Sequence, residues 1–202
     1  MIVNDNNIFP VFDKALGQQD KENLLKQRGL VIWMTGLSGA GKSTIAIALE
    51  RALNARGVMT SLLDGDNIRT GINAGLGFSE EDRKENIRRI AQVGKLFLQN
   101  GVVTIIACIS PTKELRSMAR EIIGDSNFFE IYVSTPLEVC EKRDIKGLYQ
   151  KAREGKLKSF TGISAVYEAP ESPDMEIDTS ATSVDAAVNG IMDRITPLIS
   201  YE

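Results

Sequence analysis

The chain has 202 residues, of which 43% are hydrophobic and 25% are charged, and its formal net charge at pH 7 is −3. This composition is typical of one globular domain and excludes a collagenous or broadly disordered chain. The sequence contains no histidine, which excludes Ser-His-Asp hydrolysis, Cys-His proteolysis and HExxH zinc sites. The acidic balance provides no overall basic surface, so no nucleic-acid partner is expected.

Nothing in the sequence indicates a secretory signal or a membrane span. Residues 1–29 are polar and charged, and no run of about 18 apolar residues occurs anywhere. The two cysteines, Cys108 and Cys140, lie in apolar or helical surroundings, which favours two reduced, buried thiols over a disulfide. We therefore expect a cytoplasmic protein with no membrane partner.

Short β-branched runs alternate with amphipathic stretches along the chain. Strands are predicted over residues 30–35, 58–63, 102–109, 128–133 and 175–178. Helices are predicted up to about residue 56, over 79–100 with Ser79 as its N-cap, after residue 133 through 141, and over about 183–195. This alternation implies βαβ units and a parallel sheet in one domain, residues 30–202, preceded by an N-terminal arm, residues 1–29.

A glycine-rich turn follows the first predicted strand. The segment from Gly36 to Ser43 fits the phosphate-binding pattern GxxxxGK[ST] at every fixed position and lies between a strand and a helix. Backbone N–H groups of such a loop surround phosphate oxygens, its lysine reaches the β- and γ-phosphates, and its serine holds Mg²⁺. The alternative, a chance glycine-rich turn, is disfavoured by this context. The expected nucleotide-binding residues are Gly36, Leu37, Ser38, Gly39, Ala40, Gly41, Lys42, Ser43 and Thr44.

ATP is expected rather than GTP. The sequence contains no NKxD loop, and its one DxxG string, residues 144–147, follows a helix instead of lying where a GTPase switch loop would.

Two carboxylates, Asp64 and Asp66, are predicted at the end of the second strand. Open α/β sheets bind ligands at that edge. One carboxylate beside a phosphate-binding loop can orient Mg²⁺, and the other can orient or deprotonate an attacking hydroxyl. The alternative is a hydrogen-bonded Asp-Gly turn.

The helix over 79–100 carries one charge on its apolar stripe. Arg83 lies four residues before Ile87 and continues the stripe. A buried charge needs a partner, and an anionic ligand would supply it, with Asn86 within reach of the same ligand. Arg88 and Arg89 are expected on the surface, solvated or in salt bridges.

Residues 142–158 hold seven basic side chains against two acidic ones. They are interpreted as part of a lid, about residues 145–163, that closes over anionic substrates and excludes water. A solvated basic helix is one alternative, and an RNA-binding patch with only Tyr149 and Phe160 available for stacking is another. Together these features predict an α/β fold of the P-loop NTPase type, a three-layer α/β/α sandwich with a mainly parallel central sheet and a basic lid.

Several strings, taken together and in order, closely resemble the adenylylsulfate kinase family. They are DGDNIR at 64–69, LGFS at 76–79, DRKENIRR at 82–89, ISP at 109–111, RDIKGLY at 143–149 and FTGI at 160–163. The resemblance runs from about Gly29 to the C-terminus. It implies Mg²⁺-dependent transfer of the γ-phosphate of ATP to the 3′-hydroxyl of adenosine 5′-phosphosulfate, in sulfate activation and assimilation.

The resemblance also implies roles for individual residues. Lys42, Asp66 and Ser110 would be catalytic, with Ser110 as a phosphoserine intermediate in the family pattern, although the residues themselves equally allow Ser110 simply to bind substrate. Ser43 and Asp64 would hold the metal, and Arg143 would lie over the adenine of ATP. Phe78 and Phe160 would sandwich the adenine of the acceptor. The remaining acceptor-binding residues would be Asp66, Arg69, Arg83, Asn86, Ile109, Ser110 and Lys146.

Some expectations concern departures and partners. Ser164 stands where the family commonly has aspartate, so a salt bridge in the lid is in doubt. The resemblance suggests a homodimer, and a separate ATP sulfurylase as a working partner. The apolar island Ile8-Phe9-Pro10-Val11-Phe12 in the arm is expected to pack on its own domain or on a second subunit. The competing hypotheses are a kinase for another nucleoside or nucleotide and a nucleotide-bound regulatory module without catalysis.

Overall fold

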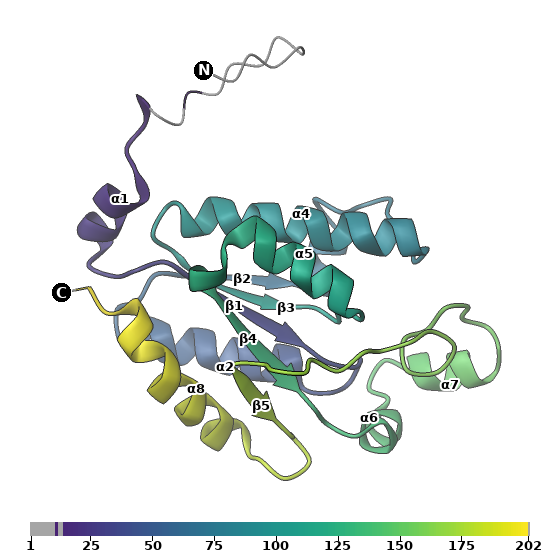
Figure 1. Ribbon diagram of the computed structural model, residues 1–202. Helices are drawn as coiled ribbons and strands as arrows, with labels where there is room; N and C mark the ends of the chain where they lie inside the picture. The colour runs from purple at the N-terminus through teal and green to yellow at the C-terminus, as the bar shows by residue number, and fades with distance from the viewer. Residues whose placement is uncertain (1–10, 12–13, 202) are drawn as a thin grey trace.

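The computed structural model describes residue 11 and residues 14–201 (Figure 1). Its sheet has five parallel strands in the order β2-β3-β1-β4-β5. The strands are β1 (Leu30–Thr35), β2 (Thr60–Asp64), β3 (Val103–Ala107), β4 (Phe128–Val133) and β5 (Met175–Ile177). The helices are α1 (Gln18–Leu25), α2 (Lys42–Asn54), α3 (Gly65–Arg69), α4 (Glu80–Leu98), α5 (Lys113–Ile123), α6 (Leu137–Arg143), α7 (Leu148–Arg153) and α8 (Val184–Ile199), with a short 3₁₀ turn, η2 (Asp125–Asn127).

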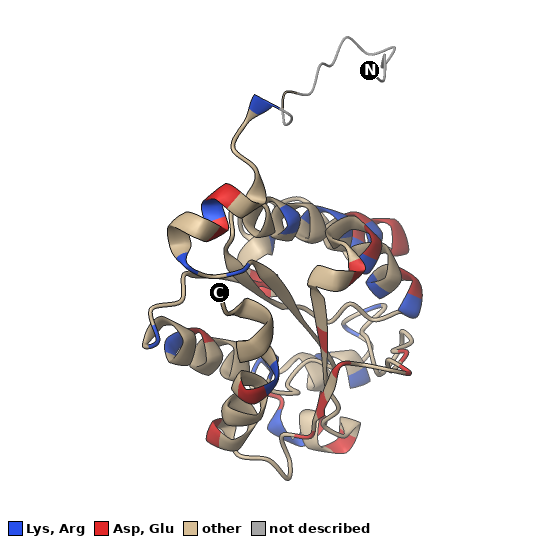
Figure 2. Cartoon of the chain, turned by 60° about the vertical axis from the view of Figure 1, so that its left-hand side comes forward, with Lys and Arg blue, Asp and Glu red and all other residues tan. Residues whose placement is uncertain are grey.

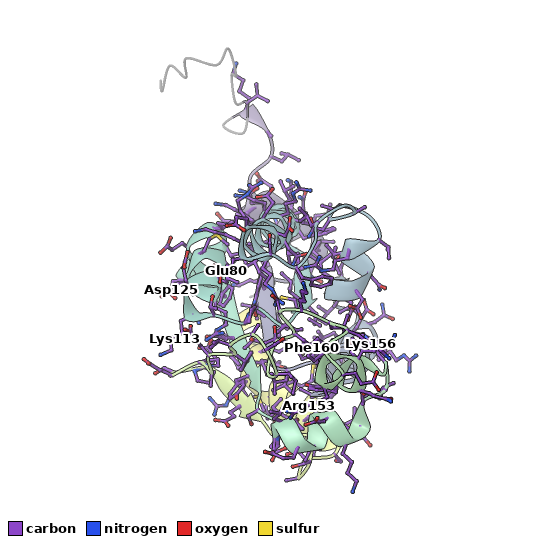
Figure 3. The ribbon with its side chains drawn as sticks, turned by 90° about the vertical axis from the view of Figure 1, so that its right-hand side faces the viewer. Glu80, Lys113, Asp125, Arg153, Lys156 and Phe160 are labelled. Atoms are coloured by element: carbon purple, nitrogen blue, oxygen red, sulfur yellow. The ribbon has the colours of Figure 1, made fainter. Side chains whose placement is uncertain are left out.

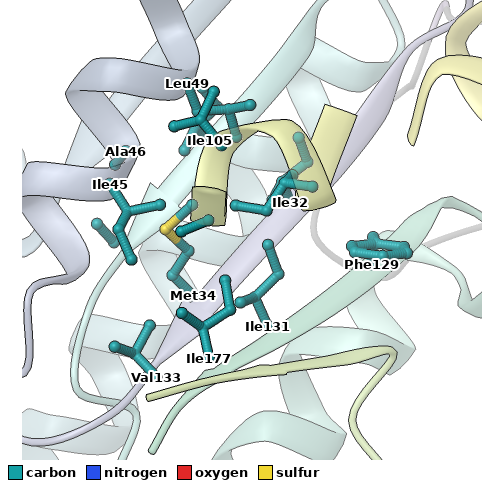
Figure 4. Packing of buried hydrophobic residues seen from close by; sticks show 14 of the residues in the cluster. Ile32, Met34, Ile45, Ala46, Leu49, Ile105, Phe129, Ile131, Val133 and Ile177 are labelled. Atoms are coloured by element: carbon teal, nitrogen blue, oxygen red, sulfur yellow. The ribbon is translucent and has the colours of Figure 1, made fainter. Parts of the chain in front are cut away.

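The alternation of side chains along β1 explains the three layers. All six residues of β1 are buried, and successive side chains of a strand point to opposite faces. Leu30, Ile32 and Met34 pack in a core with residues of α2 and α8, as Figure 4 shows in part, whereas Val31 and Trp33 pack with residues of α4 and α5. The predicted sandwich with helices on both faces is therefore confirmed.

Charged residues lie mainly on helices and loops (Figure 2). Glu130 is an exception, because it lies in the middle of β4. Its side chain is also buried, at 7% exposed. No helix in the described part of the chain is both long enough and apolar enough to cross a membrane. The two cysteines, Cys108 and Cys140, are buried free thiols, as predicted.

The predicted strands and helices all occur, with shifted ends. β2 begins at Thr60 rather than at residue 58, β3 ends at Ala107 rather than at 109, and α8 continues past residue 195 to Ile199. The placement of Asp66 at the end of a strand is wrong. The strand ends at Asp64, whose carboxylate accepts a hydrogen bond from the backbone N–H of Asp66 and thereby caps α3.

Three helices, α1, α3 and α5, were not predicted, and α7 lies within residues 142–158, for which a solvated basic helix was one alternative. The first of them lies within residues 1–29. Gln27, just after it, contacts the domain, because its Nε2 donates to Gly101 O at 2.8 Å and to Met59 O at 2.9 Å. Except for Val11, the apolar island of residues 8–12 lies outside the described residues.

Candidate active site

A cavity of about 770 Å³ opens at the carboxyl ends of the strands. Open parallel α/β sheets bind ligands at this position. Its walls come from the glycine-rich loop, α3, the start of α4, the loop after β3, residues 143–161 and the loop before α8. Every predicted site residue except Gly36, Leu37 and Ala40 lines it.

The loop from Gly36 to Ser43 depends on glycine at the turns. Gly36, Gly39 and Gly41 have φ angles of 148°, 74° and 106°, which side chains disfavour. A Cβ on Gly36 would also lie 2.5 Å from the carbonyl oxygen of Val133. Only glycine therefore allows the loop to turn against β4.

Lys42 curls back over this loop. Its Nζ donates to Gly36 O at 2.8 Å and to Leu37 O at 2.7 Å, and burial lowers the pKa of Lys42 to about 8. A buried ammonium with only carbonyl partners gains from an anion placed beside it. The arrangement is that of a phosphate-binding lysine.

Ser43 and Asp64 form the candidate magnesium position. Ser43 Oγ donates to Asp64 Oδ2 at 2.6 Å. No cluster of three His, Cys, Asp or Glu side chains that could hold a metal occurs among the described residues. Hydroxyl and carboxylate oxygens suit Mg²⁺, which usually binds one or two protein groups together with substrate phosphates. The residues present fit that mode of binding.

Asp66 faces a lysine from across the cavity. Its carboxylate forms an ion pair with Lys146, which lies between α6 and α7. Both side chains are exposed, 69% and 57% respectively. A contact between segments 80 residues apart thus closes over the carboxylate predicted to handle the acceptor hydroxyl.

The far end of the cavity gathers positive charge around an aromatic ring. The guanidinium of Arg69 lies 4.5 Å from the centroid of Phe78, and that of Arg83 lies 6.0 Å from it. Burial, together with the charge of Arg69, lowers the pKa of Arg83. Two neighbouring cations at the wall of a cavity favour an anionic ligand.

Arg83 has protein partners as well. Its Nη1 donates to Thr161 Oγ1 at 2.8 Å, its Nε donates to Phe78 O at 3.0 Å, and its Nη2 donates to Ser159 O. On the same helix, Asn86 is buried, and its Oδ1 accepts a hydrogen bond from Asn73 Nδ2 at 3.0 Å. Arg88 and Arg89 both form ion pairs with Glu85, which confirms their placement on the surface.

The segment over residues 145–163 forms one wall of the cavity. The hydroxyl of Tyr149 donates to Ser38 O at 2.8 Å, and the rings of Tyr149 and Phe160 meet edge to face at 5.0 Å. Figure 3 labels Phe160 near the middle of the view and Lys156 at the outline of the molecule. Ser164, at the position of the expected aspartate, accepts a hydrogen bond from Phe160 N at 2.9 Å and so braces this turn.

Some basic residues of this segment make surface pairs. Arg153 pairs with Glu141 and Lys156 with Glu154. These basic residues therefore lie on the surface, as expected for the alternative of a solvated basic helix.

The loop after β3 brings Ile109 and Ser110 to the cavity. Ser110 has a φ of 39°, is 1% exposed, and its Oγ accepts a hydrogen bond from Trp33 Nε1 at 3.1 Å. At the opposite end, Arg143 Nη1 donates to Thr179 Oγ1 at 2.8 Å, which places the guanidinium beside the glycine-rich loop.

Three residues that the sequence reasoning missed support the site. Thr179 accepts a hydrogen bond from Arg143 and packs against Gly41. Thr161 accepts a hydrogen bond from Arg83, and Asn73 donates one to Asn86. None belongs to a pattern that identifies it, because each acts through a partner far away in the sequence.

A phosphate-binding loop between a strand and a helix, with two carboxylates and a basic cavity opposite it, defines a P-loop phosphotransferase. The description "adenylylsulphate kinase" belongs to the family model that matches residues 28–178. The chain belongs to the adenylylsulfate kinase family and is an ATP-dependent, Mg²⁺-using kinase.

Two relatives show the extent of the similarity. The adenylyl-sulfate kinase of Bacteroides fragilis is 61% identical over 196 residues, 97% of each chain. That of Phocaeicola vulgatus is 60% identical over 195 residues, 96% of each chain. Among solved structures, the APS kinase of Mycobacterium tuberculosis in complex with AMPPNP and APS has a TM-score of 0.81 and 44% identity, and the match covers 84% of this chain and 98% of that one.

Proposed function

We propose that the cavity at the carboxyl ends of the strands carries out the reaction of the family. That reaction transfers the γ-phosphate of ATP to the 3′-hydroxyl of adenosine 5′-phosphosulfate and yields ADP and 3′-phosphoadenosine 5′-phosphosulfate. The observation that carries this proposal is that Asp66 adjoins both the phosphate-binding loop and a cation of the same cavity. Asp64 accepts hydrogen bonds from Ser43 Oγ and from the backbone N–H of Asp66, and α3 carries both Asp66 and Arg69.

The ATP end uses the loop from Gly36 to Thr44. Backbone N–H groups of the loop and the N-terminus of α2 bind phosphate oxygens, and Lys42 reaches the β- and γ-phosphates. Ser43 and Asp64 hold Mg²⁺, which neutralises the charge that develops on the transferred phosphoryl group and the leaving oxygen. Arg143 lies against the adenine, fixed in place by Thr179.

The acceptor end uses cations and aromatic faces. Arg69 and Arg83 bind the phosphosulfate oxygens, and Asn86, held by Asn73, supplies a hydrogen bond. Phe78 is 61% exposed, and this ring together with Phe160 provides stacking faces for the adenine of the acceptor. Ile109 completes the wall beside Ser110.

The chemical step follows from this arrangement. The 3′-oxygen of the acceptor attacks the γ-phosphorus in line, and the bond from that phosphorus to the β–γ bridging oxygen breaks, which leaves ADP. The proton of the 3′-hydroxyl passes to the carboxylate of Asp66, which also orients the hydroxyl. Without substrates, Lys146 is paired with Asp66. When the acceptor hydroxyl takes the place of Lys146 at this carboxylate, the ammonium group of Lys146 binds phosphate oxygens instead. The substrate and Lys146 therefore compete for the carboxylate of Asp66.

Ser110 is assigned to substrate binding in this direct transfer. The phosphoserine intermediate implied by the resemblance needs a base to activate the hydroxyl, and the sequence offers no histidine for it. The two roles predict different results, because only the intermediate leaves ³²P on the protein after incubation with γ-labelled ATP alone.

We also propose that residues 1–29 form an arm before the domain over 30–202, and that a lid over about 145–163 closes on the substrates. We further propose a cytoplasmic location, a homodimer and a separate ATP sulfurylase that supplies the acceptor. The association state is measured by light scattering of the eluted protein, and a mass of one chain would contradict the homodimer.

The test of the residue roles is Asp66→Asn, which keeps the volume and removes the charge. We expect kcat for release of ADP in the presence of adenosine 5′-phosphosulfate to fall by about 10²- to 10⁴-fold, whereas the Kd for AMPPNP by calorimetry stays within about twofold. The matched control is Glu81→Gln on the exposed first turn of α4, which should behave as the unmodified chain. Near-normal turnover of Asp66→Asn would remove Asp66 from its role.

A further inference from the structure

Ser110 adopts a backbone conformation that its residue type does not favour. Its φ of 39° lies in the left-handed region, which is unfavourable for a residue with a side chain. Such a conformation persists only where the surroundings hold it. The contacts around Ser110 therefore show what holds it.

Two buried donors hold Ser110 from opposite ends. Arg116, on α5, donates from Nη1 to the carbonyl oxygen of Ser110 at 2.9 Å, while Trp33 donates from Nε1 to Oγ at 3.1 Å. Thr35 braces the preceding carbonyl, because its Oγ1 donates to Ile109 O at 2.7 Å. Arg116 and Trp33 are 5% and 0% exposed.

The charge of Arg116 is balanced inside the protein. Its Nε lies 3.1 Å from Glu130 Oε1, and Glu130 is also approached by Arg120, whose Nη2 lies 3.6 Å from Oε2. Glu130 Oε1 has no hydrogen bond of good geometry in the described part of the chain, so charge rather than hydrogen bonding holds it. Asp174 completes the cluster by pairing with Arg120 at 3.5 Å and accepting from Glu130 N at 2.7 Å.

We propose that Arg116 is a positioning residue for phosphoryl transfer. Through the carbonyl of Ser110 it fixes the left-handed turn that keeps the Ser110 hydroxyl at the cavity, and Glu130 is its counter-charge. This inference rests on the proposed role of Ser110 in substrate binding. The hydrogen bond from Trp33 to Ser110 Oγ also indicates whether this hydroxyl donates or accepts when substrate binds. The indole N–H can only donate, so it occupies an acceptor position of Ser110 Oγ and leaves the hydroxyl hydrogen for an oxygen of the bound substrate.

A purely structural role for the ion pair makes a different prediction. Arg116 and Arg120 both pair with Glu130, but only Arg116 contacts Ser110. If the cluster only neutralised Glu130, replacing either arginine would affect folding without separating the kinetic constants. A positioning role affects the reaction through Arg116 alone.

The test compares Arg116→Lys with Arg120→Lys. Lysine keeps the positive charge but cannot reach Glu130 and Ser110 at once, because it lacks the guanidinium fork. For Arg116→Lys we expect kcat/KM for adenosine 5′-phosphosulfate to fall by about tenfold or more, with the Kd for AMPPNP within about twofold. Arg120→Lys should retain both constants within about twofold.

Intrinsic fluorescence supplies a second readout. Trp33 is the chain's one tryptophan, and its Nε1 is bonded to Ser110 Oγ, so its emission reports the position of that hydroxyl. Ser110→Ala gives the emission of Trp33 without this partner. We expect the emission of Arg116→Lys to shift towards that of Ser110→Ala.

The outcomes separate this inference from the proposed role of Ser110. If Arg116→Lys leaves kcat/KM and the emission unchanged, the positioning role is overturned while the loss in Ser110→Ala still supports the role of Ser110. If Ser110→Ala itself keeps normal kcat/KM, the role of Ser110 fails, and the positioning role fails with it. In the Ser110→Ala background, Arg116→Lys should cost less than about threefold, whereas the full additive loss would show that Arg116 acts elsewhere.

If Arg116→Lys does not fold, Glu130→Gln provides a second test of the positioning role. The amide keeps the volume and an acceptor for Arg116 but removes the counter-charge. We expect an emission shift in the same direction and a smaller loss of kcat/KM. An unchanged emission together with unchanged kinetics overturns the proposal.

Discussion

Arg83 on α4 donates a hydrogen bond to Thr161 at 2.8 Å and so joins α4 to the segment over residues 145–163 at the wall of the cavity. The sequence predicted an anionic partner for this arginine because a charge lies on the buried stripe of its helix. The structure adds the carbonyl oxygens of Phe78 and Ser159 as partners. One guanidinium thus bonds to that segment and lines the cavity.

Replacement of Arg83 should weaken the acceptor more than ATP. We expect Arg83→Gln to raise KM for adenosine 5′-phosphosulfate by about tenfold or more, because a hydrogen bond to a charged group is lost. Steady-state kinetics with each substrate varied in turn measures the effect. Arg88→Gln on the same helix, a residue paired with Glu85 on the surface, is the control. Equal losses for both substrates would contradict the placement of Arg83 at the acceptor end.

Loss of the Thr161 hydroxyl, which accepts a hydrogen bond from Arg83, should loosen the segment over residues 145–163. Thr161→Val leaves Arg83 without one of its partners, which costs about 1.5–3 kcal/mol for a hydrogen bond to a charged group and raises the population of the open segment. Trypsin should then cut after the basic residues of 151–158 about tenfold faster. Thr60→Val, a substitution of the same kind in β2, is the control. Identical half-lives would show that Arg83 and Thr161 do not hold the segment.

Binding of ATP should depend on pH through Lys42. Burial lowers the pKa of this lysine to about 8, so the free protein loses the ammonium charge as the pH rises through that value. Bound phosphates favour the charged form and raise the pKa again. The Kd for Mg-AMPPNP should therefore increase about tenfold between pH 7 and pH 9. Calorimetry at the two pH values tests this, and an equal Kd at both would contradict the assignment of Lys42.

Thr104 offers a test of the core. Among the described residues, its buried Oγ1 has no hydrogen-bond partner. Thr104→Val should stabilise the protein by about 1 kcal/mol and raise Tm by about 2–4 °C. By contrast, Thr135→Val removes a buried hydroxyl that bonds to Ala40 O at 2.9 Å, and it should lower Tm. A calorimetric scan in which both variants lose stability equally would contradict this account of Thr104.

The strands were predictable because burial on both faces requires continuous apolar runs, as in β1. The sequence also carries a signal for α5, since Thr112 caps it and Leu115, Ala119 and Ile123 form an apolar stripe. The first helix, α1, has no buried residue. Polar contacts near its end, such as that of Glu22 with Gly29, tie it down, and no periodicity in the sequence reveals them.

The site was predictable where chemistry is encoded locally. The loop from Gly36 to Ser43 carries its glycines, lysine and serine in one string, so its position and purpose follow from spacing. The left-handed turn at Ser110 and the ion pair between Arg116 and Glu130 depend on tertiary contacts between α5 and β4. No local pattern specifies these contacts, so only the structure reveals what holds Ser110.

The most direct test of the central claim is the release of ADP by the purified protein with Mg-ATP. It is measured with adenosine 5′-phosphosulfate, with AMP as the control acceptor, and without an acceptor. The account predicts release that requires the phosphosulfate. Equal release with AMP would indicate a broader nucleotide kinase. Absence of release despite binding of AMPPNP would contradict phosphoryl transfer in this cavity and support a regulatory module.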